Sequence, residues 1–153
     1  METKTIENKI FFKEVAERVT EGARVRIRAR GNSMLPFIRD GKDDIILEKP
    51  NTRSFQKGRL LLAKLQDDRY VLHRVKKIKG NNILLRGDGN LNIYENCTSG
   101  NIIAEATEII RNGKSITTNT LRWKLYSFLW PGNLFLRRVA LALYRRQFLS
   151  VCL

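Results

Sequence analysis

The first part of the chain has a hydrophobic pattern with helical spacing. Apolar side chains recur at intervals of three or four residues, at Phe11, Phe12, Val15, Ala16 and Val19. This spacing places them on one face of an amphipathic helix. Gly22 stands where such a helix would end, because glycine readily adopts the left-handed conformation found at helix C-termini. The pattern predicts a helix over residues 6–19.

After residue 22 the spacing of the apolar positions changes from four to two. Residues 23–30 alternate apolar side chains with arginines, as expected for a strand with one buried face. Short runs with strand character then follow at residues 44–48, 59–65, 69–78, 82–86, 102–110 and 115–118. Glycine, asparagine, aspartate or proline residues separate these runs and favour tight turns. The pattern predicts a mainly β (α+β) fold with an antiparallel, curled or barrel-like sheet.

The character of the chain changes again at Asn119. Residues 121–153 are rich in leucine, aromatic residues and arginine, and only Pro131-Gly132-Asn133 interrupts them. Because proline and glycine end regular helices, this pattern predicts two short helices around the interruption. We therefore expect a β-rich domain over residues 1–118, with its β region at residues 23–118, and a basic amphipathic helical tail over residues 119–153.

The composition adds a strong positive charge to this picture. The 153 residues include 29 Lys and Arg but 15 Asp and Glu, for a formal net charge of +14. Such an excess favours anionic partners, either nucleic acid or an acidic membrane surface. The arginines of the first predicted strand, Arg24, Arg26, Arg28 and Arg30, form either a solvated face or a contact for such a partner. No aromatic residues interleave with them, which argues against nucleic acid as the partner.

The tail suits contact with an anionic membrane but not passage through it. Its uncharged run over residues 125–136 is shorter than the roughly 20 residues that a spanning helix needs, and the polar N-terminus does not resemble a secretory signal. Aromatic residues beside arginines favour shallow insertion at the lipid interface. The candidate membrane-binding residues are Trp123, Phe128, Trp130, Phe135, Arg137 and Arg138. We therefore expect a cytoplasmic or peripherally membrane-associated protein; the alternative is that the tail packs on the β domain.

Three residues could supply the chemistry of a serine hydrolase. Ser33 lies on an irregular stretch between Gly31 and Pro36, which leaves its backbone N–H free to donate to an oxyanion. His73, the single histidine, falls on a predicted strand and could act as the base that a serine nucleophile needs. Asp88 lies between two glycines and could orient that histidine. Each element alone is ordinary, because such turns are common in loops and a lone histidine is often a core residue.

Together these residues resemble a known group of peptidases. The motifs Gly31-x-Ser33-Met34-x-Pro36, His73-Arg74-Val75 and Gly87-Asp88-x-Asn90 occur in the order and spacing of type I signal peptidases and of the related self-cleaving repressor-type peptidases of the S24/S26 group. The resemblance covers about residues 23–110 and implies a mostly β catalytic fold. It implies Ser33 as nucleophile, His73 as general base and Asp88 as supporting acid. Histidine in place of the more usual lysine looks like the signal peptidases of the endoplasmic reticulum, archaea and some spore-formers.

Two positions differ from the pattern of this group. The group's usual Gly-Asp after the serine motif is one residue longer here, so either Asp43 or Asp44 could take the aspartate position. Some members donate to the oxyanion with a serine hydroxyl two residues before the nucleophile, where this chain has Gly31. The resemblance therefore implies donation by the backbone alone, from the N–H of Ser33.

The sequence thus predicts a serine endopeptidase of the signal-peptidase type that cleaves a peptide or precursor protein through an acyl-enzyme. This chemistry needs no metal or organic cofactor, and Cys97 and Cys152 lack the spacing of a zinc site or of a disulfide framework. Two alternatives stay open. One is a self-cleaving, repressor-like regulator, which would need a DNA-binding helix-turn-helix before Ser33. The other is a non-enzymatic basic module that binds nucleic acid or an anionic membrane.

Overall fold

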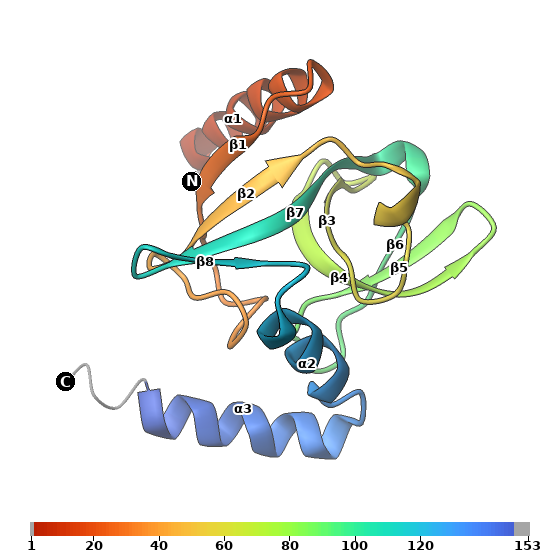
Figure 1. The fold of residues 1–153 in the computed structure, drawn as a ribbon. Helices are drawn as coiled ribbons and strands as arrows, with labels where there is room; N and C mark the ends of the chain where they lie inside the picture. The colour runs from red at the N-terminus through yellow and green to blue at the C-terminus, as the bar shows by residue number, and fades with distance from the viewer. Residues whose placement is uncertain (1, 149–153) are drawn as a thin grey trace.

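A curled antiparallel sheet forms the centre of the structure, a computed structural model that describes residues 2–148 (Figure 1). The sheet has eight strands in the order β1-β2-β7-β3-β4-β5-β6, with β8 paired to β7. Their bounds are β1 (Val25–Arg28), β2 (Asp44–Glu48), β3 (Leu60–Lys64), β4 (Tyr70–Lys79), β5 (Asn82–Arg86), β6 (Glu95–Thr98), β7 (Ile102–Arg111) and β8 (Lys114–Thr117), and the loops hold the short 3₁₀ helices η1 (Thr52–Ser54) and η2 (Ser99–Asn101). The predicted mainly β fold with a curled antiparallel sheet is confirmed.

The long strand β7 pairs on both of its edges. Residues 105–110 pair with β2 on one edge, and on the other edge residues 102–105 pair with β3 and residues 108–111 with β8. Irregular registers interrupt three of the sheet's ladders, between Ile46 and Leu47, Leu62 and Ala63, and Val75 and Lys77. Because an extra residue bends a strand and increases its twist, these bulges help the sheet to curl.

Strand β3 contributes side chains to both hydrophobic clusters of the core. Leu60 and Leu62 belong to the first cluster, and Leu61 and Ala63 belong to the second. This division follows from the opposite directions of successive side chains on a strand. Both faces of β3 are therefore covered, which accounts for its continuous apolar sequence.

Helix α1 (Glu2–Thr20) packs on the first cluster through its predicted apolar face. Val15 is 3% exposed and Val19 is 1% exposed. Gly22, just beyond the helix, has a φ of +89°, the left-handed conformation expected there. The predicted helix over residues 6–19 is confirmed, and it extends to residue 2. Burial of two valine side chains contributes about 3–6 kcal/mol before the cost of ordering the chain is subtracted.

Two further helices, α2 (Leu121–Leu129) and α3 (Leu134–Phe148), lie on either side of the predicted interruption. They are at the opposite end of the molecule from α1 (Figure 1). Trp123 of α2 is 3% exposed, and its ring meets that of Phe37 edge-on with centroids 4.9 Å apart. Thr120 caps this helix by accepting the N–H of Trp123 at 3.3 Å. Helix α2 therefore contributes to the first cluster of the core.

Arg24 and the arginines of β1 form an ion-paired face with carboxylates of β2 and β7. The pairs are Arg24 with Glu48 and Glu108, and Arg26 and Arg28 with Asp44. Their arginine side chains stay 50–60% exposed. Exposed ion pairs add little to stability, because water and salt screen them. The structure thus favours the simpler of the two interpretations, a solvated strand face.

Candidate active site

Ser33 lies on the loop that joins β1 to β2. Gly31 in this loop has a φ of +90°, which favours glycine, and its N–H donates to Asp40 Oδ1 at 3.0 Å. The side chains that follow the serine anchor the loop in the core, and the buried ones are Met34, Leu35, Phe37 and Ile38. Ser33 itself is half-buried. It therefore stands on an irregular but well-anchored segment.

The loop of residues 87–89 packs backbone to backbone against the serine loop. The Gly89 N–H donates to the Ser33 carbonyl at 2.8 Å. A Cβ atom on Gly87 would lie 2.3 Å from that carbonyl and 3.1 Å from His73 Nε2, and one on Gly89 would lie 2.4 Å from a second backbone oxygen of the serine loop. Both positions require glycine, because a packed backbone cannot move away from an added methyl group at low cost. Gly87 of the Gly-Asp-Gly motif thus lies against both the Ser33 backbone carbonyl and His73 Nε2.

His73 is buried on β4, opposite Leu61 of β3, and is 4% exposed. Its Nε2 faces Gly87, whereas its Nδ1 is buried and has no hydrogen-bond partner among the described residues. Burial lowers the pKa of His73 below its ordinary value of 6.5, against the opposing influence of the Glu95 and Asp88 charges. The ring is therefore neutral at pH 7 and able to accept a proton.

Ser33 and His73 line the same cavity, which has a volume of about 310 Å³. Its other walls are mostly apolar and come from α1, β1, the serine loop, β2, β3 and β4. They include Phe11, Phe12, Ile27, Met34, Tyr70 and Leu72. Phe12 stacks on Tyr70 with ring centroids 4.7 Å apart, which joins α1 to β4. The structure thus brings the predicted nucleophile and the predicted base to one apolar cavity.

Asp88 does not contact His73 as expected. Its carboxylate is fully buried and accepts hydrogen bonds from Arg74, with Nε to Oδ1 at 2.9 Å and Nη2 to Oδ2 at 2.7 Å. Neighbouring side chains of a strand point to opposite faces, so Asp88 can reach only one of His73 and Arg74. An unpaired buried guanidinium is more costly than an unpaired neutral imidazole. The prediction that Asp88 orients His73 by direct contact is wrong, and Asp88 instead fixes the 87–89 loop to β4.

The C-terminal helices also hold the 87–89 loop. Arg137 of α3 is fully buried, and its Nη1 donates to the carbonyls of Gly87 at 3.1 Å and Asp88 at 3.0 Å. The Trp130 indole N–H donates to the same Asp88 carbonyl at 3.1 Å. No sequence pattern indicated these contacts, because they join segments that lie 42 to 50 residues apart. Arg137 and Trp130 are thus supporting residues of the site that the sequence reasoning missed.

This arrangement corrects the predicted membrane-binding set. The prediction is wrong for Trp123 and Arg137, which are buried, and Trp130 turns its indole N–H inward to the loop at Asp88. Three of the predicted residues remain exposed, namely Phe128, Phe135 and Arg138. For these three, membrane contact stays a prediction. Within residues 2–148, no helix is both long enough and apolar enough to cross a membrane.

Both candidate aspartates after Gly41 have structural partners. Asp43 is fully buried and accepts hydrogen bonds from Arg111 Nη2 at 2.6 Å and from the Arg39 N–H at 2.8 Å, which ties the serine loop to β7. Burial alone would raise the pKa of Asp43, but these hydrogen bonds and positive charges outweigh it and lower the pKa. Asp44 pairs with the arginines of β1. Asp43 is therefore the aspartate that positions the serine loop.

A curled antiparallel sheet that brings a loop serine and a strand histidine to one cavity fits the class of serine peptidases and self-cleaving repressors. A family model described as Peptidase S24-like matches residues 2–114, and the chain belongs to this family. The match confirms the S24/S26 group that the motifs suggested, and it ends before α2 and α3. The search of curated proteins finds no match for the chain.

Proposed function

We propose that the protein is a serine endopeptidase of the signal-peptidase type that cleaves a precursor peptide. Ser33 is the nucleophile and His73 is the general base. The observation that carries the proposal is that these two residues line one mostly apolar cavity, and that Gly87 lies against both the Ser33 backbone carbonyl and His73 Nε2. Membership of the Peptidase S24-like family fits the same chemistry.

The reaction follows from the neutral state of His73. As the Ser33 oxygen attacks the scissile carbonyl, Nε2 of the histidine takes the hydroxyl proton, and the Ser33 backbone N–H donates to the oxyanion. The intermediate collapses to an acyl-enzyme while the imidazolium gives its proton to the leaving amine. Water, deprotonated by the same histidine, then releases the acyl group. The Asp88 carboxylate is engaged by Arg74 and does not orient the imidazole. The packing of β4 holds the imidazole in place instead.

The cavity favours a substrate with an apolar side chain close to the scissile bond. Phe11 and Phe12 of α1 form one wall, and Leu72 of β4 forms another. A side chain placed among them gains about 25 cal/mol for each Å² of apolar surface that leaves water. The proposed substrate is therefore a peptide segment with apolar character beside the cleaved bond, rather than a charged one.

A serine-directed acylating probe tests the proposal. We expect the probe to label the wild-type protein, not to label Ser33→Ala, and to label His73→Ala at least about a hundredfold more slowly, since the base contributes at least that factor in related chemistry. Ser115→Ala, which removes an exposed serine of β8, is the matched control and keeps full labelling. Labelling that survives in both site variants would overturn the proposal.

The same samples separate cleavage of another protein from self-cleavage. Intact-mass measurement of the wild-type protein incubated alone shows whether fragments form. If fragments appear in the wild type but not in Ser33→Ala, the chain is its own substrate, as the self-cleaving alternative predicts. If the mass stays intact while the probe labels Ser33, the peptidase acts on a separate substrate.

A further inference from the structure

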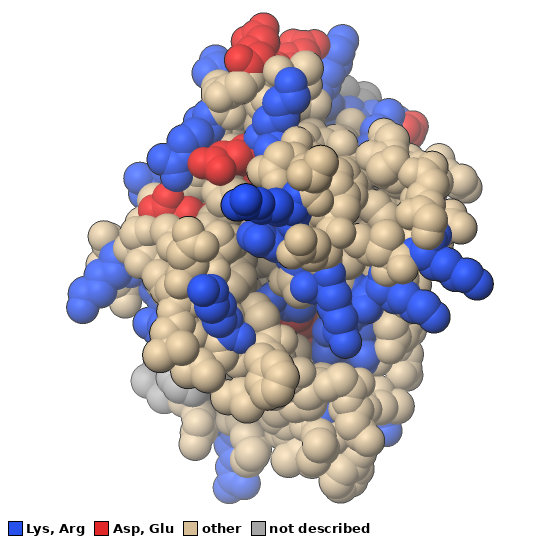
Figure 2. Space-filling model, turned by 45° about the vertical axis from the view of Figure 1, so that its right-hand side comes forward, with Lys and Arg blue, Asp and Glu red and all other residues tan. Residues whose placement is uncertain are grey.

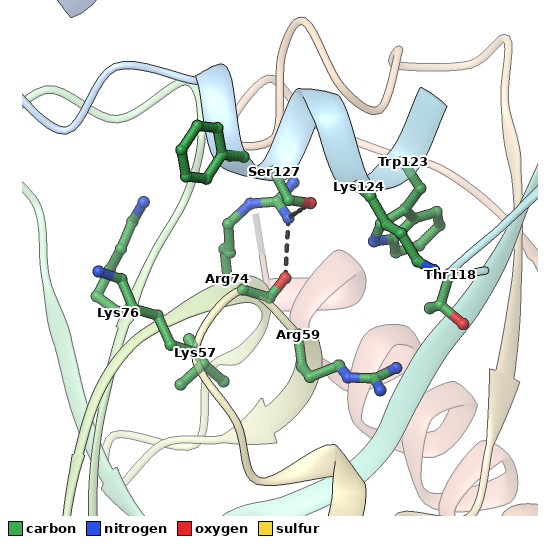
Figure 3. A pocket seen from close by; sticks show the side chains of 11 residues that line it. Lys57, Arg59, Arg74, Lys76, Thr118, Trp123, Lys124 and Ser127 are labelled. Carbon is green, nitrogen blue, oxygen red and sulfur yellow. Dashed lines mark hydrogen bonds between the residues drawn. The ribbon is translucent and has the colours of Figure 1, made fainter. Parts of the chain in front are cut away.

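A second pocket lies on the part of β4 that follows His73, between the turn before β3 and helix α2. It has a volume of about 450 Å³, and neither Ser33 nor His73 lines it. Figure 3 shows Lys57 and Lys76 on one side of this pocket and Lys124 on the other, with the Arg74 guanidinium and Ser127 between them. Apolar surface comes from Trp123 and Phe128.

The charged residues that line this pocket are all basic. Its basic residues are Lys57, Arg59, Arg74, Lys76 and Lys124, and no aspartate or glutamate lines it. The two arginines have acidic partners outside the lining, because Arg59 meets Glu105 at 3.2 Å and Arg74 meets Asp88 at 2.7 Å. The three lysines have no acidic partner among the described residues. Basic side chains also gather across the middle of the face shown in Figure 2, whereas the acidic ones lie mostly toward its top.

We propose that this pocket binds a phosphate group through Lys57, Lys76, Lys124 and the hydroxyl of Ser127. The Ser127 Oγ accepts a hydrogen bond from Arg74 Nη1 at 2.7 Å, so its own O–H is free to donate into the pocket. Donors that approach from two sides suit an anion with more than two acceptor oxygens. A phosphate meets this requirement, whereas a carboxylate offers two oxygens in one plane.

The environment of Lys76 supports the same ligand. Burial lowers the pKa of Lys76 to about 8, and the Arg137, Arg74 and Arg86 charges add to the effect, against the opposing charge of Asp88. The half-buried ammonium group thus lacks the compensation that a buried charge requires. A phosphate beside Lys76 supplies that compensation.

Two sources of the phosphate group have the same chemistry, a small phosphate in solution and the headgroup of an anionic lipid. Phe128 lines the pocket and is 86% exposed, and the next residue of α2, Leu129, is 67% exposed. An apolar rim beside a cationic pocket is what a lipid headgroup with its acyl chains would contact. The experiment therefore uses both sources as probes.

Binding of inorganic pyrophosphate to the full chain is measured by titration calorimetry at constant ionic strength. Binding to vesicles is measured by flotation with phosphatidylcholine alone and with added phosphatidylglycerol. We expect Lys76→Met and Lys124→Met each to weaken binding by about tenfold, the scale of one charge-assisted hydrogen bond. Lys114→Met, which removes an exposed lysine of β8 outside the pocket, is the charge-matched control with unchanged binding. Lys76→Met removes a half-buried charge, so its melting temperature should stay level or rise.

The pattern across the variants decides the outcome. Lysine-dependent pyrophosphate binding supports a small phosphate ligand, and lysine-dependent binding to phosphatidylglycerol vesicles alone supports a lipid headgroup. If the wild type binds neither probe, or if Lys114→Met loses as much affinity as the pocket variants, the proposal is overturned. Ser33→Ala should bind the probes like the wild type, so this result is independent of the peptidase reaction.

Discussion

Nη1 of Arg137 lies 3.0 Å from the carbonyl oxygen of Asp88 and 3.1 Å from that of Gly87. A buried arginine of α3 thus supports the loop that lies against the Ser33 carbonyl and His73 Nε2. The family match ends at residue 114, so the contact links the matched region to a segment beyond it. The C-terminal helices are therefore part of the framework of the candidate site.

Replacement of Arg137 by methionine should weaken both the fold and the site. The substitution removes the Arg137 hydrogen bonds to the 87–89 loop. The Asp88 carbonyl then keeps only the Trp130 indole N–H, and the Gly87 carbonyl keeps only the Asn90 N–H. We expect the free energy of unfolding to fall by about 1–3 kcal/mol. A displaced loop should also slow probe labelling of Ser33 by about tenfold or more. Urea unfolding and labelling kinetics measure the two effects. Arg145→Met removes an exposed arginine of the same helix, and equal slowing in that control would contradict the supporting role.

Gly87→Ala should separate Ser33 from His73 without removing either. The added methyl group would lie 2.3 Å from the Ser33 carbonyl, so one of the two loops must move. Overpacking of this kind costs about 1–3 kcal/mol, and we expect labelling to be lost in a protein that still unfolds cooperatively. At Gly100 an added methyl group meets only Thr98 Oγ1 at 3.8 Å, so Gly100→Ala is the control. Normal labelling of Gly87→Ala would show that the close approach of the loops is not needed.

Periodicity in the sequence predicted the elements that bury one clear face. Helix α1 and seven of the strands lie close to their predicted ranges. In α1 and β1 the apolar side chains recur at the period of the element, whereas β3 is a continuous apolar run bounded by turn residues. Strand β6 was missed. Its four residues, Glu95–Thr98, include one buried apolar side chain, Cys97, and only its pairing with β5 makes it a strand.

The motifs of the site predicted that Ser33 and His73 would come together, but not how the surrounding residues pair. His73 and Arg74 are adjacent on β4, and both are buried. Which of them pairs with Asp88 depends on the free-energy cost of burying the other without a partner. The roles of Trp130 and Arg137 depend on how the tail folds back on the β domain. Aromatic and basic residues in this pattern occur both in segments that contact lipid and in segments whose side chains donate hydrogen bonds to the protein interior. The sequence pattern therefore does not distinguish the two roles.

The pH dependence of labelling should report on His73. Burial lowers the pKa of His73 from 6.5, so the labelling rate should rise through a midpoint below 6.5 and stay level at pH 7. The same shift makes the free energy of unfolding depend on pH. Between the pKa of His73 in the folded state and its value of 6.5 in the unfolded state, the unfolded state binds more protons. The contribution of His73 to stability is therefore complete above pH 6.5 and falls as the pH drops from 6.5 to the folded-state pKa. Urea unfolding on both sides of pH 6.5 checks this sign. A midpoint above 6.5 would contradict a buried, neutral base.

Asp88→Asn distinguishes a carboxylate that orients His73 from one that holds Arg74. Loss of the charge leaves the buried guanidinium uncompensated, and we expect the free energy of unfolding to fall by about 3–5 kcal/mol. The Asp88 charge raises the pKa of His73, so its removal should also shift the labelling midpoint to lower pH. In the double variant Arg74→Met with Asp88→Leu, no charge is left unpaired, and stability should partly return. If Asp88→Asn instead abolishes labelling with little loss of stability, the carboxylate acts on the histidine directly and the pairing with Arg74 is secondary.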